Sequence, residues 1–131
     1  EEKRVKIIKK LIEKNNLEIF INFNFTNLSP GNFLIFNSIC EENKINFEGS
    51  FLKNLEILLN LYKKNKNVDL INLIYLLTDY YFYNLKNQKL CSIETIIERK
   101  SFTINNINKF ILYSLNQYSL INAINRKLFN E

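Results

Sequence analysis

Few side chains in this sequence of 131 residues could do acid–base chemistry, and histidine is absent. The nearest approach to paired carboxylates is Glu41 with Glu42, and Glu94 with Glu98. A four-residue spacing puts Glu94 and Glu98 on one helix face, where one could act as an acid and the other as a base. We interpret both pairs as solvated surface carboxylates, because solvation explains them without a catalytic partner.

The two cysteines, Cys40 and Cys91, lie far apart in the chain and lack the spacing of a metal site. Neither has a basic partner in the sequence that would favour the thiolate form. Small buried hydrophobes in a reducing cytoplasm are the simpler interpretation. The two glycines are too far apart for a phosphate-binding loop. We therefore expect no catalytic residue, no metal, no cofactor and no small-molecule ligand, in a chain that is not an enzyme.

Eighteen lysines and arginines against 13 acidic residues give a net charge of +5, which suggests nucleic acid as a partner. The basic residues form small clusters with acidic residues between them, and the largest holds Lys63, Lys64 and Lys66. An A/T-rich genome also favours the Lys, Asn, Ile, Phe and Tyr codons that dominate here. We interpret the charge as solvated helix faces.

No stretch is apolar over the roughly 20 residues that a membrane span needs, and nothing resembles a signal peptide. We therefore expect a cytoplasmic protein without membrane contact. The sequence contains no methionine, even at position 1, which suggests a piece of a longer protein.

The one strong local backbone signal is Ser29-Pro30-Gly31, with the only proline and one of two glycines. Ser29 can accept from the free N–H groups of a helix start, which is worth about 1 kcal/mol. Pro30 then falls at the first helical position, where its fixed φ is suitable and its missing N–H costs nothing. Leu28 before the cap and Phe33 after it are spaced for a hydrophobic staple. We predict a helix start here.

Apolar residues at helical spacing predict an all-α bundle of about seven helices. Ser50, Ser92 and Thr103 are expected to cap three of them. Residues 43–48 are expected to be a polar break between domains. The expected helices cover residues 3–14, 29–42, 51–64, 68–86, 92–99, 103–118 and a last one from about 119. The helix over 68–86 is apolar almost all round, so most of its faces should be buried.

Residues 17–28 fit two patterns. Ile21, Phe23 and Phe25 alternate with asparagines, as in a strand. The same segment also fits a helical stripe, which consists of Leu17, Phe20, Ile21, Phe25 and Leu28. A strand would need a partner, and no second alternating run lies nearby, so we favour a helix.

Two short segments resemble the C-terminal half of bacterial DNA polymerase III clamp-loader subunits, and the delta-prime subunits most of all. Residues 28–34, Leu-Ser-Pro-Gly-Asn-Phe-Leu, resemble the start of a lid helix that follows the AAA+ nucleotide-binding core. Residues 123–127, Ala-Ile-Asn-Arg-Lys, resemble an Asn-Leu-Asp-Arg-Lys stretch of the final collar helix. Ile124 and Asn125 stand where Leu and Asp are usual.

The resemblance implies that residues 1–44 are the remainder of the AAA+ lid and that residues 47–131 are a helical collar domain. Collar domains of this family assemble into a five-subunit ring, which holds the ATPase modules while they load a sliding clamp onto primed DNA. Gly31 aligns with a nucleotide-sensing arginine of ATP-hydrolysing relatives. The resemblance therefore implies a structural and regulatory subunit, in contact with other clamp-loader subunits and with DNA only indirectly.

We expect the last helix to join the bundle core to a neighbouring subunit through Ile124, Arg126 and Lys127. Alone, the chain should be monomeric or weakly self-associating. Two alternatives stay open. The first is a stand-alone helical protein–protein adaptor, and the second is a basic helical module that binds nucleic acid through the lysine cluster and nearby tyrosines.

Overall fold

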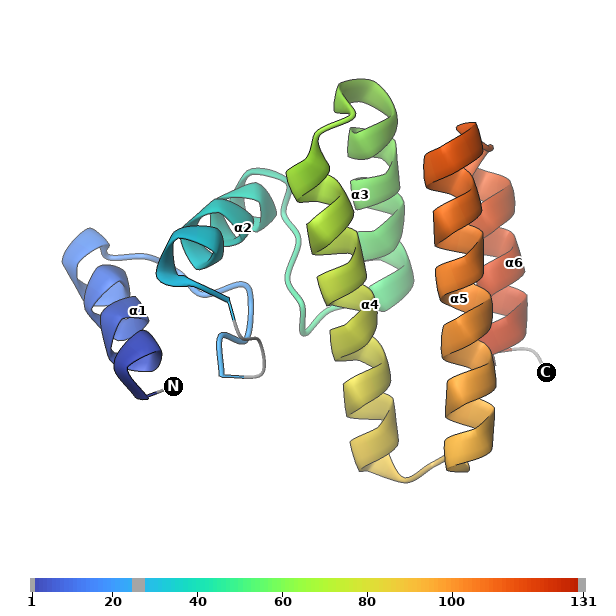
Figure 1. Cartoon of the computed structure of the whole chain (residues 1–131), viewed down its shortest axis with the longest axis horizontal. Coiled ribbons are helices and arrows are strands. Elements are labelled where there is room, and N and C mark those ends of the chain that lie inside the picture. Colours follow the sequence, from blue (N-terminus) through green and yellow to red (C-terminus); the bar gives the residue numbers. More distant parts are fainter. Residues whose placement is uncertain (1, 25–27, 130–131) are drawn as a thin grey trace. The chain divides into compact units, whose positions relative to one another are not determined.

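Helices form all the regular structure in the computed structural model, which describes residues 2–24 and 28–129 (Figure 1). In chain order these are α1 (Glu2–Asn15), α2 (Pro30–Glu42), α3 (Phe51–Asn65), α4 (Val68–Gln88), α5 (Ile93–Tyr113) and α6 (Gln117–Phe129). The all-α prediction is confirmed for this part of the chain. The chain divides into two compact units, Glu1–Ser50 and Phe51–Glu131. We call them the first unit and the second unit.

In the first unit, α1 and α2 pack against each other. Ile8 of α1 is fully buried and joins Phe23 and Phe33 in one apolar cluster. The rings of Phe23 and Phe33 meet edge-on, with centroids 5.6 Å apart. Asn16 follows α1 with a φ of 51°, a left-handed conformation that asparagine tolerates well. The two helices and the segment between them therefore share one small core.

The segment between α1 and α2 is irregular over residues 17–24 and at Leu28, so the helix expected over 17–28 is wrong there. Phe25, which belongs to that expected stripe, lies outside the described residues. Ile21 is buried, although the described residues around it in this segment are not helical. The backbone of this segment finds its partners in α2 instead, as shown below for Asn37.

The connection between α2 and α3 is less polar than its sequence suggests. Ile45 and Phe47, inside the expected polar break, are both buried. The N–H of Phe47 donates to the carbonyl of Phe20 at 3.0 Å, which fixes this connection to the segment after α1. The boundary between the two units falls after Ser50, a few residues beyond the expected one.

Helices α3 to α6 form a four-helix bundle, in which each helix packs against the next and α6 packs back against α3 (Figure 1). Short connections of this kind give antiparallel neighbours. Each connection holds one residue with a left-handed backbone, namely Lys66, Lys89 and Ser114. The buried apolar residues of the bundle are Phe51, Leu55, Leu58, Leu59, Tyr62, Leu70, Leu73, Ile74, Leu77, Tyr80, Phe82, Ile96, Ile107, Phe110, Leu120, Ile124 and Leu128.

Helix α5 is continuous over 21 residues, so the two helices expected over 92–99 and 103–118 are wrong. Ser92 does cap α5, since its Oγ accepts from the N–H of Thr95 at 3.2 Å. Thr103 caps nothing. Its side chain is buried, and its hydroxyl donates to the carbonyl of Arg99 one turn earlier at 2.8 Å. A threonine inside a helix can satisfy its hydroxyl in this way.

The described residues therefore form six helices rather than about seven. The helix expected to end near residue 118 ends at Tyr113, because Ser114 takes a left-handed φ of 51°. The last helix begins at Gln117, close to the expected start near Ser119.

Helix α4 is less buried than its apolar sequence suggests. Leu73, Ile74 and Leu77 are buried, whereas Val68 and Tyr83 are exposed. The buried side chains serve the contacts of α4 with α3 and α5. Across residues 2–24 and 28–129, no helix combines the length and the apolar character that a bilayer crossing requires.

Candidate functional site

The start of α2 has the geometry expected for Ser29-Pro30-Gly31. The Oγ of Ser29 accepts from the N–H of Asn32 at 3.1 Å, and Pro30 is the first helical residue. Leu28 packs against the apolar cluster that contains Phe33. A Cβ added to Gly31 would meet no atom within 4 Å, and this glycine has no positive φ. Neither space nor backbone therefore requires glycine at position 31.

Arg4 holds the segment that leads to this helix start. Its Nη1 donates to the carbonyl of Phe23 at 3.2 Å and to the carbonyl of Leu28 at 3.1 Å. A single guanidinium group thus ties α1 to two points of the chain before Ser29, the carbonyls of Phe23 and Leu28. Sequence reasoning missed this role, because the two acceptors are backbone atoms 19 and 24 residues away.

Asn37 is the second residue that holds this segment. It lies on α2, is buried, and bridges two backbone groups. Its Oδ1 accepts from the N–H of Phe20 at 2.9 Å, and its Nδ2 donates to the carbonyl of Glu18 at 2.8 Å. The amide replaces the hydrogen bonds that a helix or strand would have supplied to residues 18–20. The only sign of this role in the sequence is that Asn37 is a polar residue in the middle of an apolar helical stripe.

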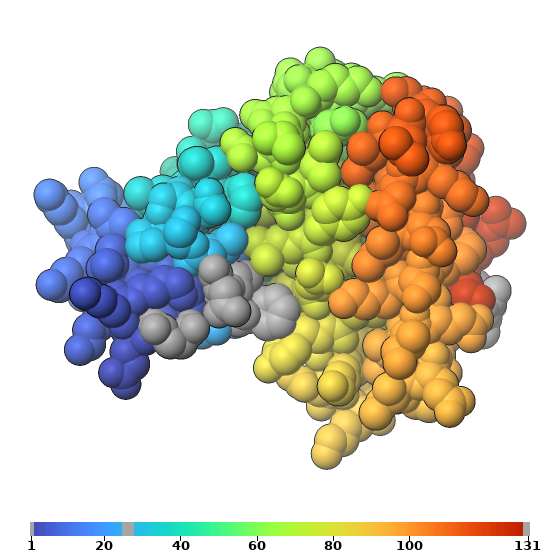
Figure 2. Space-filling view, in the orientation of Figure 1, coloured from blue at the N-terminus to red at the C-terminus, as the bar shows by residue number. Residues whose placement is uncertain are grey.

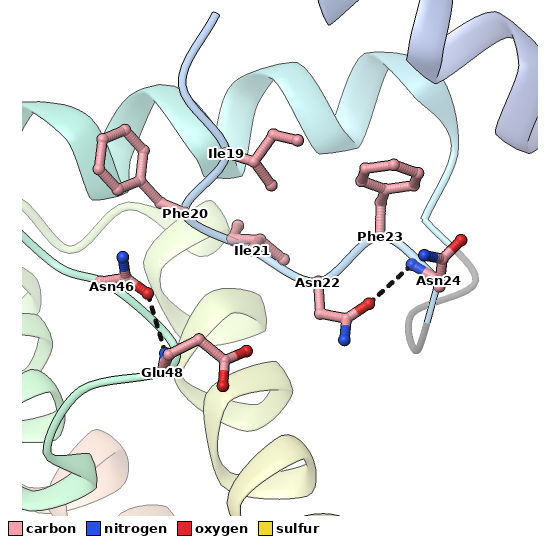
Figure 3. Close-up of a pocket in the computed structure, with 8 residues that line it drawn as sticks. All are labelled: Ile19, Phe20, Ile21, Asn22, Phe23, Asn24, Asn46 and Glu48. Carbon is pink, nitrogen blue, oxygen red and sulfur yellow. Dashed lines mark hydrogen bonds between the residues drawn. The ribbon is translucent and has the colours of Figure 1, made fainter.

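A hollow of about 280 Å³ lies beside this segment and is lined by residues 19–24, Asn46 and Glu48 (Figure 3). Two of its asparagine side chains already serve local turns. The Oδ1 of Asn22 accepts from the N–H of Asn24 at 3.0 Å, and the Oδ1 of Asn46 accepts from the N–H of Glu48 at 2.9 Å. Such bonds are typical of asparagine turns. The hollow therefore reflects turn structure.

The two thiols have different surroundings. Cys40 is fully buried, and burial raises the pKa of its thiol from the ordinary value of 9.0 to about 12. A thiol with such a pKa is a poor nucleophile at neutral pH. Cys91 is half-buried, and Nη1 of Arg99 lies 3.7 Å from its Sγ. The expectation that neither thiol has a cationic partner is therefore wrong for Cys91, because the chain brings Arg99 back to it.

One of the carboxylates with a candidate acid–base role forms an ion pair with a lysine. Glu98 is exposed and accepts from Nζ of Lys127 at 2.8 Å. This hydrogen bond, and then the positive charge of Lys127, holds the pKa of Glu98 below its usual range. Glu98 is thus an ion-pair partner between α5 and α6. Within residues 2–24 and 28–129, no three Cys, Asp or Glu side chains gather where they could bind a metal.

The three residues expected to contact a neighbouring subunit lie in different environments on α6. Ile124 is fully buried in the bundle and offers no surface to a partner. Lys127 pairs with Glu98, and its Nζ lies 5.7 Å from the ring centroid of Phe102. Arg126 is exposed and lines a hollow of about 290 Å³ together with Lys127 and Phe102. Arg126 is therefore the exposed one of the three residues.

Comparison with known proteins gives no relative. No protein-family model matches the chain, and neither the curated proteins nor the solved structures include a significant match.

Proposed function

We propose that this chain is a non-catalytic helical assembly module, whose second unit joins it to other protein subunits. In its specific form, the proposal is that the chain is the C-terminal part of a cytoplasmic DNA polymerase III clamp-loader subunit of the delta-prime type. The first unit then corresponds to the remainder of the lid and the second to the collar. The short motifs at residues 28–34 and 123–127 support this specific form.

Exposed apolar side chains at one end of the bundle carry the general proposal. Around the connection between α4 and α5, the exposed fraction is 76% for Leu90, 62% for Ile93 and 60% for Ile97. Large apolar side chains left in water side by side are typical of a surface that a partner covers. We call Tyr83, Leu90, Ile93 and Ile97 the apolar end of the bundle.

The register of α4 against α5 brings these residues together. Nζ of Lys100 on α5 lies 3.1 Å from Oδ1 of Asp79 on α4. One turn closer to the connection, α4 carries Tyr83 and α5 carries Ile97. Tyr75 donates to Asn108 further from the connection, which fixes the same antiparallel register. The four residues of the apolar end therefore lie on the end of α4, the start of α5 and the connection between them.

The size of the apolar end suits a subunit within a larger assembly. Full burial of one Leu or Ile side chain contributes about 1.5 to 3 kcal/mol. Association itself costs about 4 to 15 kcal/mol in lost freedom of motion, so three such side chains give weak binding on their own. A stable complex needs further contacts, as a ring in which each subunit has two neighbours would supply.

The test is reconstitution of the full chain with the ATP-hydrolysing subunits of a bacterial clamp loader, analysed by size-exclusion chromatography with light scattering. Wild type should be monomeric or weakly self-associating alone and should enter the complex. Ile97→Asp should weaken its entry at least tenfold. Leu112→Asp, the same kind of change at the opposite end of the bundle, should leave it unchanged.

Arg126→Glu in the same assay tests whether α6 also contacts the neighbour. Failure of the wild-type chain to join any clamp-loader subunit would overturn the specific assignment. A tight homo-oligomer, or unchanged association of Ile97→Asp, would overturn the role of the apolar end.

A further inference from the structure

The opposite end of the bundle is formed by two connections that are distant in sequence. Nζ of Lys66 donates to Oγ of Ser114 at 3.1 Å, and Nζ of Lys63 donates to Oε1 of Gln117 at 3.2 Å. Gln117 also donates to Oδ1 of Asn60 at 2.6 Å. These bonds fix the connection between α3 and α4 beside the connection between α5 and α6. Figures 1 and 2 show the green and orange-red segments adjacent at this end.

Positive charge gathers on this end, where none of the three lysines forms an ion pair with an acidic side chain in the part of the chain that the structure describes. Lys63, Lys64 and Lys66 are all exposed, and the acceptors of Lys63 and Lys66 are neutral oxygens. The other lysines that bridge helices in the second unit are different, because Lys100 and Lys127 both bind carboxylates. Nζ of Lys66 also lies 5.0 Å from the ring centroid of Tyr62, which is neutral too. No described side chain therefore neutralises the charge of the three lysines.

The helix dipoles at this end of the bundle contribute little to its net charge. Two helices begin at this end and two finish there, so their partial charges largely offset one another. The first free N–H groups of α4 and α6 already bond to the side chains of Asn67 and Asn116. Asp69, in the first turn of α4, is the one acidic residue close to the lysines in the chain. The lysine side chains thus decide the sign of the surface.

Two open tyrosine rings lie beside the lysines. Tyr113 is 70% exposed and Tyr118 is 57% exposed, and they directly neighbour Ser114 and Gln117, the acceptors of the lysines. Two tyrosines of α4 are unsuited to this role, and Tyr83 lies at the apolar end. Tyr80 is buried, and the ring of Tyr81 stacks on Phe51 at 4.4 Å. The available aromatic surface therefore comes from the connection between α5 and α6.

We infer that this end of the second unit binds single-stranded nucleic acid, with Lys63, Lys64 and Lys66 at the phosphates and Tyr113 and Tyr118 stacked on bases. Unpaired bases stack on exposed aromatic rings, whereas a duplex keeps its base faces hidden. A peptide of acidic residues alone, such as polyglutamate, would pair with the lysines but has no ring to stack on either tyrosine. The inference is independent of subunit association, which uses the opposite end of the bundle.

The test is fluorescence anisotropy of the full chain with a labelled 20-nucleotide single-stranded DNA or RNA over a series of salt concentrations. Three neutralised phosphates predict a slope of about −2 for log K against log salt. Loss of one stacked base should weaken binding about 10- to 100-fold.

Four variants separate stacking from charge. Tyr113→Ala and Tyr118→Ala should each weaken binding by that factor with the salt slope unchanged, while Tyr113→Phe should bind like wild type. Lys64→Gln should weaken binding and reduce the magnitude of the slope by about 0.7. All three side chains are exposed, so these variants should keep the fold.

Matched controls lie at the apolar end. Tyr83→Ala and Lys86→Gln remove an exposed tyrosine and an exposed lysine there and should not change binding. Absence of binding at 50 mM salt would refute the inference. Equal affinity for duplex of the same sequence, equal competition by polyglutamate, or indifference to both tyrosine changes would also refute it, because each indicates attraction by charge alone.

Discussion

Asn37 shows how one side chain can decide the path of a neighbouring segment. Two backbone groups of residues 18–20 depend on its amide, which is buried on α2. A buried polar group left without its partner costs about 1 to 3 kcal/mol. The segment is irregular because α2 supplies hydrogen bonds that the segment does not make within itself.

Asn37→Ala should therefore destabilise the first unit by about 2 kcal/mol or more, since both backbone groups lose their partner. Urea unfolding combined with amide hydrogen exchange resolves the effect on this unit. Asn105→Ala makes the same substitution at an exposed position of α5 and should change stability by less than about 0.5 kcal/mol. Equal stability of the two variants would show that Asn37 does not hold the segment.

Gly31 is a residue for which the structure gives no local reason. The backbone does not need it, and an added Cβ meets open space. Under the clamp-loader proposal it stands where ATP-hydrolysing relatives carry an arginine. A side chain would fit at position 31, so packing does not explain why the chain has a glycine there.

At the scale of elements, the continuity of α5 is the feature that most changed the expected fold. One helix of 21 residues replaces two, and Thr103 lies in its interior. The unbroken helix carries the ion pair to α4 at Lys100 and the ion pair to α6 at Glu98. It thereby links both of its neighbours in the bundle.

Asn105→Pro tests whether α5 is one continuous helix or two helices, the second of which begins after Thr103. In the first turn of a helix that began after Thr103, proline would be tolerated. In the interior of α5 it removes a hydrogen bond and clashes with the preceding turn, at a cost of about 3 kcal/mol or more. Thermal unfolding followed by circular dichroism should show this loss, with Asn105→Ala near wild type. A midpoint for the proline variant equal to that of the alanine variant would mean that α5 is interrupted.

At the scale of the molecule, both ends of the second unit expose large apolar side chains, and one of them also gathers three lysines beside two tyrosines. The apolar end presents Leu90, Ile93 and Ile97, whereas the other end presents three lysines beside Tyr113 and Tyr118. Antiparallel helices separate the two ends by the length of α4 and α5. One bundle can therefore offer one end to a protein partner and the other to nucleic acid.

The second unit should fold by itself, because its four helices close a ring of contacts around a core of its own. Residues 51–131 expressed alone should be helical and should unfold in one cooperative transition on heating. Leu73→Ala, in the core, should cost about 2 to 5 kcal/mol. Leu112→Ala, on the surface, should have little effect. A gradual transition without cooperativity would contradict this independence.

The sequence by itself determined the features that depend on a few neighbouring residues. The start of α2 at Ser29 and Pro30, the cap at Ser92 and the apolar stripe of α3 all follow from bonds and contacts within one or two helical turns. For the same reason, the all-α class was predictable from the spacing of apolar residues. These interactions form wherever the local sequence permits a helix.

Only the tertiary structure decided the rest. Asn37 meets residues 17 and 19 positions away, and Lys63 reaches Gln117 across 54 positions. Ile124 is buried because α6 packs against α3 and α5, which its own sequence could not specify. The same packing gathers lysines and tyrosines from two connections into one surface. Such contacts depend on which helices pack together, and that choice is made by the whole core rather than by any local pattern.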